Sequence, residues 1–108
     1  MTTSDLLREL RSNNVKETAC LIQPAYPVEG ALCLTKTDEG PWRVFLNERG
    51  DYLINETFQS EHDASRFFLK RALSEPTYQK GFTPELLHTW PSRKKQILAK
   101  YGFEDDGL

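Results

Sequence analysis

The sequence predicts an α+β fold: a small antiparallel sheet of three to four strands, with an N-terminal helix and two or more C-terminal helices packed on one face. Its 108 residues match the usual size of one domain. Short apolar stretches separated by turn residues fill the middle of the chain, and apolar residues recur at helical spacing on both sides of them. We therefore expect residues 1–108 to form a single domain.

The first helix is expected to begin at Thr3 or Ser4, whose hydroxyl groups can cap it, with Asp5 against its positive end. The leucines between residues 6 and 10 then fall on one face. Asn13-Asn14 is a plausible end for this helix.

Four apolar stretches separated by turn residues are expected to form strands. Residues 24–30 contain two prolines and a glycine and read as a loop, whereas Asp38–Pro41 and Glu48–Asp51 read as hairpin turns. Gly50 can supply the positive φ that the second turn needs. The meander predicted in this way has its strands at Thr18–Ile22, Ala31–Lys36, Trp42–Asn47 and Tyr52–Phe58.

Two further helices are predicted after the sheet. Ser60–Asp63 resembles a capping box, and an aromatic helix follows it until Pro76, which cannot continue a helix. Thr83-Pro84-Glu85 is typical of a helix start, and Pro91 is expected to interrupt or restart the helix that follows. Residues 76–102 thus read as a helical extension and residues 103–108 as an acidic tail.

The charge balance, the N-terminal residues and the lengths of the apolar stretches narrow the class of protein. The 14 basic and 16 acidic residues are evenly spread, which disfavours direct nucleic-acid binding, and the only basic run, Arg93–Lys95, reads as a solvated helix face. Residues Met1–Asp5 lack the pattern of a signal peptide, and no apolar stretch is long enough to span a membrane. Cytoplasm is the expected compartment.

Catalytic and metal-binding patterns are missing from the sequence. Cys20 and Cys33 lie in apolar strands and read as buried hydrophobes, although a disulfide between them is possible if the strands are neighbours. His62 and His88 do not stand at metal-ligand spacing, and the glycines are too scattered to wrap a phosphate. The sequence therefore predicts a protein that is not an enzyme and has no cofactor.

Three segments of the chain carry a resemblance to a known family: Trp42–Gly50, Phe58–Glu61 and Ala64–Leu69. With the strand Ala31–Leu34 before them, they resemble small immunity proteins of bacterial polymorphic-toxin systems, including the contact-dependent growth inhibition type. The resemblance covers about residues 6–73. It departs at Leu46-Asn47, where the family has Tyr-Ser, and at Ser65, where the family has cysteine.

The resemblance implies that the chain is made beside a toxin and neutralises it by stoichiometric complex formation. Many such toxins are nucleases, whose cationic sites an inhibitor can cover with carboxylates. For Arg49, the alternative to a contact with the toxin is a structural role in the hairpin turn. The alternative function is that of a small adaptor or regulatory binding domain without a toxin partner. The candidate partner-binding residues are Asp38, Glu39, Glu48, Arg49, Asp51, Tyr52, Glu56, Glu104, Asp105 and Asp106.

Overall fold

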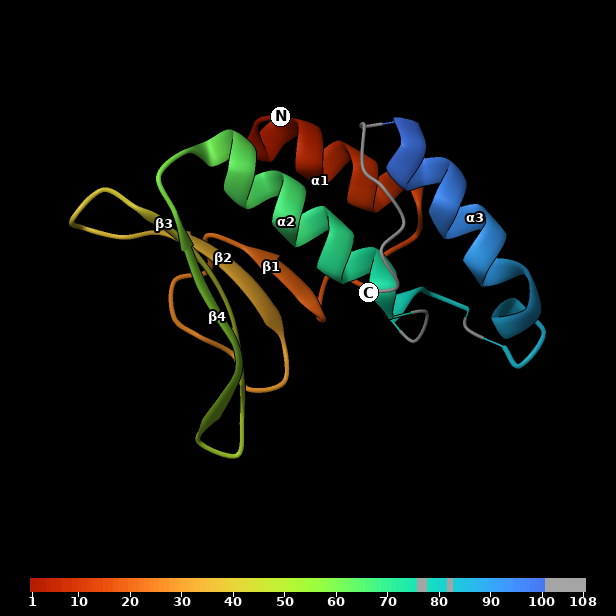
Figure 1. Ribbon diagram of the computed structural model, residues 1–108. Coiled ribbons are helices and arrows are strands. Elements are labelled where there is room, and N and C mark those ends of the chain that lie inside the picture. Colours follow the sequence, from red (N-terminus) through yellow and green to blue (C-terminus); the bar gives the residue numbers. More distant parts are fainter. Residues whose placement is uncertain (76–77, 82, 101–108) are drawn as a thin grey trace.

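One four-stranded sheet and three helices make up the described part of the chain, in the α+β arrangement that the sequence predicts. The structure is a computed structural model and describes residues 1–75, 78–81 and 83–100. Figure 1 shows the helices together on one side of the sheet. In chain order the elements are α1 (Thr3–Ser12), β1 (Cys20–Ile22), β2 (Leu32–Lys36), β3 (Trp42–Glu48), β4 (Asp51–Phe58), α2 (Glu61–Ser74) and α3 (Leu86–Lys100).

The sheet is mixed, because its first strand is parallel to its neighbour. Strands β2, β3 and β4 form the predicted antiparallel meander, but β1 pairs with β2 in parallel, through Cys20↔Leu32 and Ile22↔Leu34. The antiparallel prediction is thus wrong for β1, which is also shorter than predicted. Residues 23–31 run back along the sheet before β2 begins, and only such a crossover, not a tight turn, can join parallel neighbours.

Alternation along the strands sorts their side chains between two faces. Leu32, Leu34 and Val44 lie on the face that α2 covers, where they are buried together with Phe68 and Leu69 of that helix. The opposite face carries a smaller cluster made of Ala31, Cys33 and Phe45, with Leu21 beside it. In Figure 1 none of the described helices lies on that side. We call it the outer face.

Helix α2 begins at its predicted cap, where Ser60 Oγ accepts the amide of Asp63 at 3.1 Å. It ends at Ser74, and Glu75, the residue before Pro76, is extended as proline requires. Helix α1 is capped by Thr2 and not by Thr3 or Ser4, because Thr2 and Asp5 bond to each other reciprocally. These bonds lower the pKa of Asp5, the backbone bond with Thr2 first.

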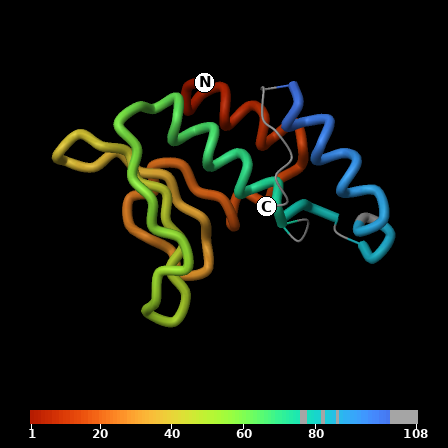
Figure 2. The backbone as a smooth tube through the Cα atoms, viewed as in Figure 1, coloured from red at the N-terminus to blue at the C-terminus, as the bar shows by residue number. Residues whose placement is uncertain are grey.

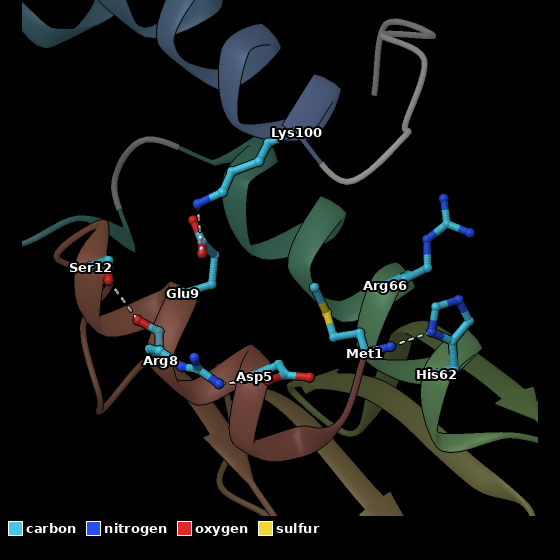
Figure 3. Close-up of a pocket in the computed structure, with 8 residues that line it drawn as sticks. All are labelled: Met1, Asp5, Arg8, Glu9, Ser12, His62, Arg66 and Lys100. Atoms are coloured by element: carbon cyan, nitrogen blue, oxygen red, sulfur yellow. Dashed lines mark hydrogen bonds and ion pairs between the residues drawn. The ribbon is translucent and has the colours of Figure 1, made fainter.

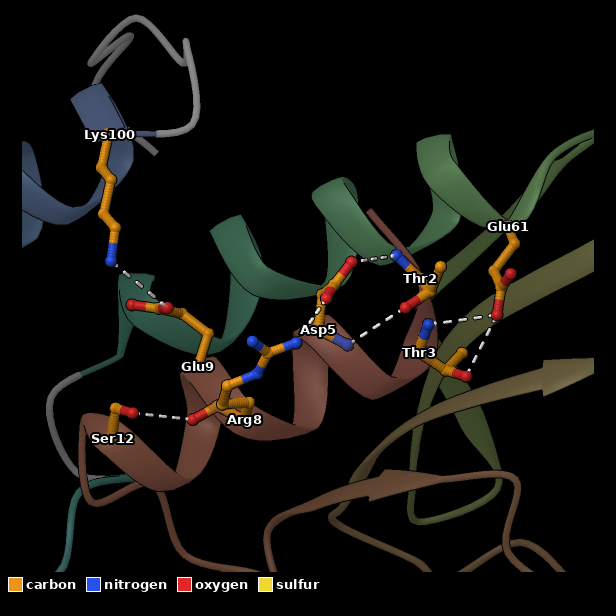
Figure 4. A network of polar contacts seen from close by, with 8 residues as sticks. All are labelled: Thr2, Thr3, Asp5, Arg8, Glu9, Ser12, Glu61 and Lys100. Atoms are coloured by element: carbon orange, nitrogen blue, oxygen red, sulfur yellow. Dashed lines mark hydrogen bonds and ion pairs between the residues drawn. The ribbon is translucent and has the colours of Figure 1, made fainter.

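Two polar contacts fix the helices relative to one another. The Thr3 amide and hydroxyl both donate to Glu61 Oε2, at 3.1 and 3.0 Å, which ties the start of α1 to the start of α2 (Figure 4). Trp90 Nε1 of α3 donates to the Leu73 carbonyl of α2 at 3.0 Å. With Trp90 and Leu98 buried in the main core, α3 continues through Pro91, so the predicted interruption is wrong.

The two cysteines lie on neighbouring strands but on opposite faces of the sheet. Cys20 belongs to the core under the helices, whereas Cys33 belongs to the outer cluster, and both are buried and unpaired. The disulfide considered above is therefore excluded. Burial raises the pKa of Cys20 from 9.0 to about 12, and burial also raises the pKa of Cys33.

We predict that neither thiol reacts with a disulfide reagent in the native protein and that both react after unfolding. Because Cys20 ionises in the unfolded chain near 9 and in the folded protein only near 12, its contribution to stability is complete below the lower value and is lost as the pH rises through this range. Chemical denaturation across these pH values should show that loss, and Cys20→Ala should reduce it. An intact mass lacking two hydrogens would contradict the assignment.

Candidate functional site

The turn between β3 and β4 is a two-residue hairpin turn. Arg49 has φ 54° and Gly50 has φ 83°, the positive pair that characterises a type I′ turn. The positive φ predicted for Gly50 is confirmed. Arg49 therefore has a demonstrated role in the backbone of the hairpin, and its side chain is exposed.

The loop before β2 is attached to this hairpin. The Arg49 amide donates to Glu29 Oε1, and the Gly30 amide donates to the Asn47 carbonyl at 2.8 Å. At its other end, the loop is held by the Gln23 amide, which donates to the Leu34 carbonyl at 2.7 Å. Loop and hairpin therefore form one corner of the molecule, at the end of the sheet opposite the β2–β3 turn (Figure 2).

This corner exposes large apolar side chains. Tyr26 and Val28 of the loop are 73% and 41% exposed, and Tyr52 and Leu53 of β4 are 50% and 61% exposed. A bulge explains Leu53, because Leu46 pairs with Ile54 and Asn47 with Tyr52, which leaves Leu53 without a partner on β3. Together with Glu29, Glu48, Arg49 and Asp51, these four side chains define what we call the corner surface.

Tyr52 is held in place by contacts on the outer face. Its ring meets Phe45 edge-on with centroids 6.2 Å apart, and the Arg43 guanidinium lies 4.8 Å from its centroid. Arg43 also lies 4.5 Å from the Phe45 ring and donates from Nε to Asn55 Oδ1 at 2.8 Å. An exposed aromatic ring with few accessible rotamers is a good anchor for a protein partner, since little side-chain entropy remains to be lost on binding.

The corner surface also carries two carboxylates at close quarters. Glu48 and Asp51 are directly opposite each other in the β3–β4 register, and like charges in that position repel. Within the described residues neither carboxylate forms an ion pair. The pair thus presents unneutralised negative charge at the turn end of the hairpin, on the opposite face from Tyr52.

The sequence-predicted residues do not form one site. Glu48, Arg49, Asp51 and Tyr52 meet at the corner surface, but Asp38 and Glu39 stand in the β2–β3 turn, about 20 Å away along β3. Glu56 lies on β4 in register with Val44, on the helix side of the sheet. Glu104, Asp105 and Asp106 lie outside the described residues.

The sequence prediction did not include Tyr26, Val28 and Leu53 of the corner surface, nor Arg43, which packs against Tyr52. A weak signal existed for Leu53, an apolar residue out of step with the alternation of Tyr52, Ile54 and Glu56. Tyr26 and Val28 carried no such signal, because their place depends on where the loop docks.

A separate concavity of about 640 Å³ lies among the helices (Figure 3). Its charged groups largely pair with one another: Arg8 lies 2.6 Å from Asp5, and Lys100 lies 3.9 Å from Glu9. His62 contacts the Met1 amine. Both carboxylates that line the concavity are thus already paired with basic side chains of the same lining. Its lining residues are Met1, Asp5, Arg8, Glu9, Ser12, His62, Arg66 and Lys100.

Metal-binding clusters and membrane-spanning helices are both missing from the described residues. No group of three or more His, Cys, Asp or Glu side chains is placed to hold a metal ion in this part of the chain. None of its helices has both the length and the apolar character that crossing a membrane requires.

Comparison with protein-family models, with curated proteins and with solved structures finds no match to this chain. The corner surface therefore has to be interpreted from its own chemistry. That chemistry is a rigid aromatic ring, exposed aliphatic side chains and two unpaired carboxylates.

We predict that the turn itself is sensitive to substitution. Gly50→Val places a β-branched residue at a φ of 83° and should lower the free energy of unfolding by about 1 kcal/mol or more. Arg49→Asn is the matched control, since asparagine tolerates positive φ and should leave stability unchanged or higher. Chemical denaturation measures both. Equal stability of wild type and Gly50→Val would contradict the turn assignment.

Proposed function

We propose that this protein neutralises a bacterial toxin, in the cytoplasm, by forming a stoichiometric complex with it through the corner surface. The observation that carries the proposal is the combination of exposed apolar side chains and unpaired acids on one rigid corner. Protein interfaces combine such aromatic anchors with a polar rim. The segment Trp42–Gly50, on which the resemblance to immunity proteins depends, forms β3 and the turn of this corner.

The charge of the corner fits a nuclease as the toxin. A nuclease must hold phosphate and is therefore cationic at its active site. Glu48 and Asp51 can occupy that site in place of phosphate oxygens, while Tyr52, on the opposite face of the hairpin, contacts an apolar part of the toxin. Complementary charge accelerates encounter, and the apolar contacts then slow dissociation. Neutralisation by this route consumes one inhibitor for each toxin molecule.

The alternative is a small adaptor or regulatory binding domain that uses the same surface for another protein. The apolar part of the corner, with Tyr26, Val28 and Leu53, fits any protein partner and so leaves this alternative open. Gene neighbourhood separates the two functions, because an immunity protein is encoded beside its toxin.

We predict stoichiometric inhibition. Increasing amounts of this protein, added to the toxin domain encoded immediately upstream, should abolish toxin activity with a break at equimolar ratio. Isothermal titration calorimetry on the same pair should give the same ratio. Full protection at a small fraction of that ratio would reject the proposal in favour of an enzymatic antidote.

We also predict that the acids of the corner dominate recognition over those at the other end of the sheet. Reversing Glu48 and Asp51 to Lys should weaken binding of that toxin domain by about 2 kcal/mol or more and slow association at low salt. Reversing Asp38 and Glu39 to Lys changes the net charge equally and should have a much smaller effect. Equal losses from both pairs would indicate that net charge, and not the corner surface, governs binding.

A further inference from the structure

Strand β4 leaves one edge of the sheet open. It is the last strand in the order β1-β2-β3-β4, and no described segment pairs with the edge of β4 that faces away from β3. At eight residues it is also the longest strand, and all of its residues except Ile54 and Phe58 are exposed. Half of its backbone donors and acceptors therefore face away from β3.

Most proteins protect such an edge, usually with lysine or proline in the strand or with a covering helix. Residues Asp51–Phe58 contain neither lysine nor proline. The bulge at Leu53 affects only the turn end of the strand. From Ile54 onward, β4 offers a regular edge to which another strand can bond.

A concavity of about 300 Å³ lies next to this edge on the helix side of the sheet. Ile54 of β4 forms part of its wall together with Leu32 and Leu46, and Arg71 and Tyr78 stand opposite. A strand added along β4 would place one of its side chains beside Ile54, which lines this concavity. The apolar part of the wall favours an aliphatic side chain there.

Glu56 specifies the charge of the segment that would bind. It stands two residues after Ile54 and therefore on the same face, it is exposed, and it forms no ion pair within the described residues. The only other charge on β4 is the acid Asp51. A basic side chain on the added strand would neutralise Glu56.

We propose that β4 binds an extended segment of a partner protein as an added strand, with an aliphatic residue beside Ile54 and a lysine or arginine beside Glu56. The inference rests on the proposed function in taking the partner to be a protein. A second copy of this chain fits the edge less well, because its own β4 would bring two further acids and no base. Main-chain bonds would supply the affinity, whereas the concavity and Glu56 would supply the specificity.

Selection from a display library of random linear peptides tests the pairing without any toxin. Peptides selected on the wild-type protein should be enriched in an aliphatic and a basic residue separated by one position. On Glu56→Lys the basic residue should be replaced by Asp or Glu. The matched control Glu39→Lys, at the other end of the sheet, should retain the wild-type preference. Circular dichroism verifies that both variants fold.

Hydrogen exchange with a selected peptide tests the backbone part of the proposal. The β4 amides that face away from β3 should exchange at least about tenfold more slowly in the complex, whereas the amides of β2, already paired on both sides, should not change. Three results would overturn the proposal: no alternating motif, the same motif from Glu56→Lys, or unchanged exchange in β4. A wild-type dimer whose formation protects β4 would also overturn it, by identifying a second copy as the occupant. Because no toxin enters these measurements, their failure is separate from a failure of neutralisation.

Discussion

The fold depends on the packing of one helix against one face of a small sheet. Helix α2 buries Phe68 and Leu69 against Leu32, Leu34 and Val44, and the other two helices reach the core by packing beside α2. Because the helices lie on a single side, none of them covers the outer face (Figure 1). The β4 edge is unpaired among the described residues. The core under α2 is thus separated in space from the corner surface and the β4 edge, which we propose as binding surfaces.

The outer face needs some cover, because Cys33 and Phe45 would otherwise meet water. The loop of residues 23–31 lies beside this small cluster. The position of the loop is fixed by the bonds that Glu29 and Gly30 form with the β3–β4 hairpin. Tyr26 and Val28 are exposed as a result of this docking. A surface that is ordered before binding loses less conformational entropy in a complex than a flexible loop does.

Local chemistry was readable from the sequence, whereas long-range pairing was not. The Ser60 cap and the positive φ of Gly50 are consequences of a few adjacent residues, and both were predicted correctly. Parallel pairing of β1 depends on the path of residues 23–31, and continuation of α3 through Pro91 depends on burial of Trp90 next to it. The separation of Asp38 and Glu39 from Glu48 and Asp51 is a consequence of the strand topology, because consecutive turns of a meander lie at opposite ends of its strands.

The corner surface and the open edge share strand β4, which carries Tyr52, Ile54 and Glu56. Tyr52 lies with Phe45 on the outer face, whereas Ile54 and Glu56 lie on the helix side, so one partner strand along β4 could reach both faces at once. Backbone bonding along the edge is independent of side-chain identity. Exposed residues such as Glu56 could therefore change with the partner while the bonding of the edge and the core under α2 stayed the same. In a small domain built in this way, the proposed binding surface can change its specificity without loss of the stability that the core provides.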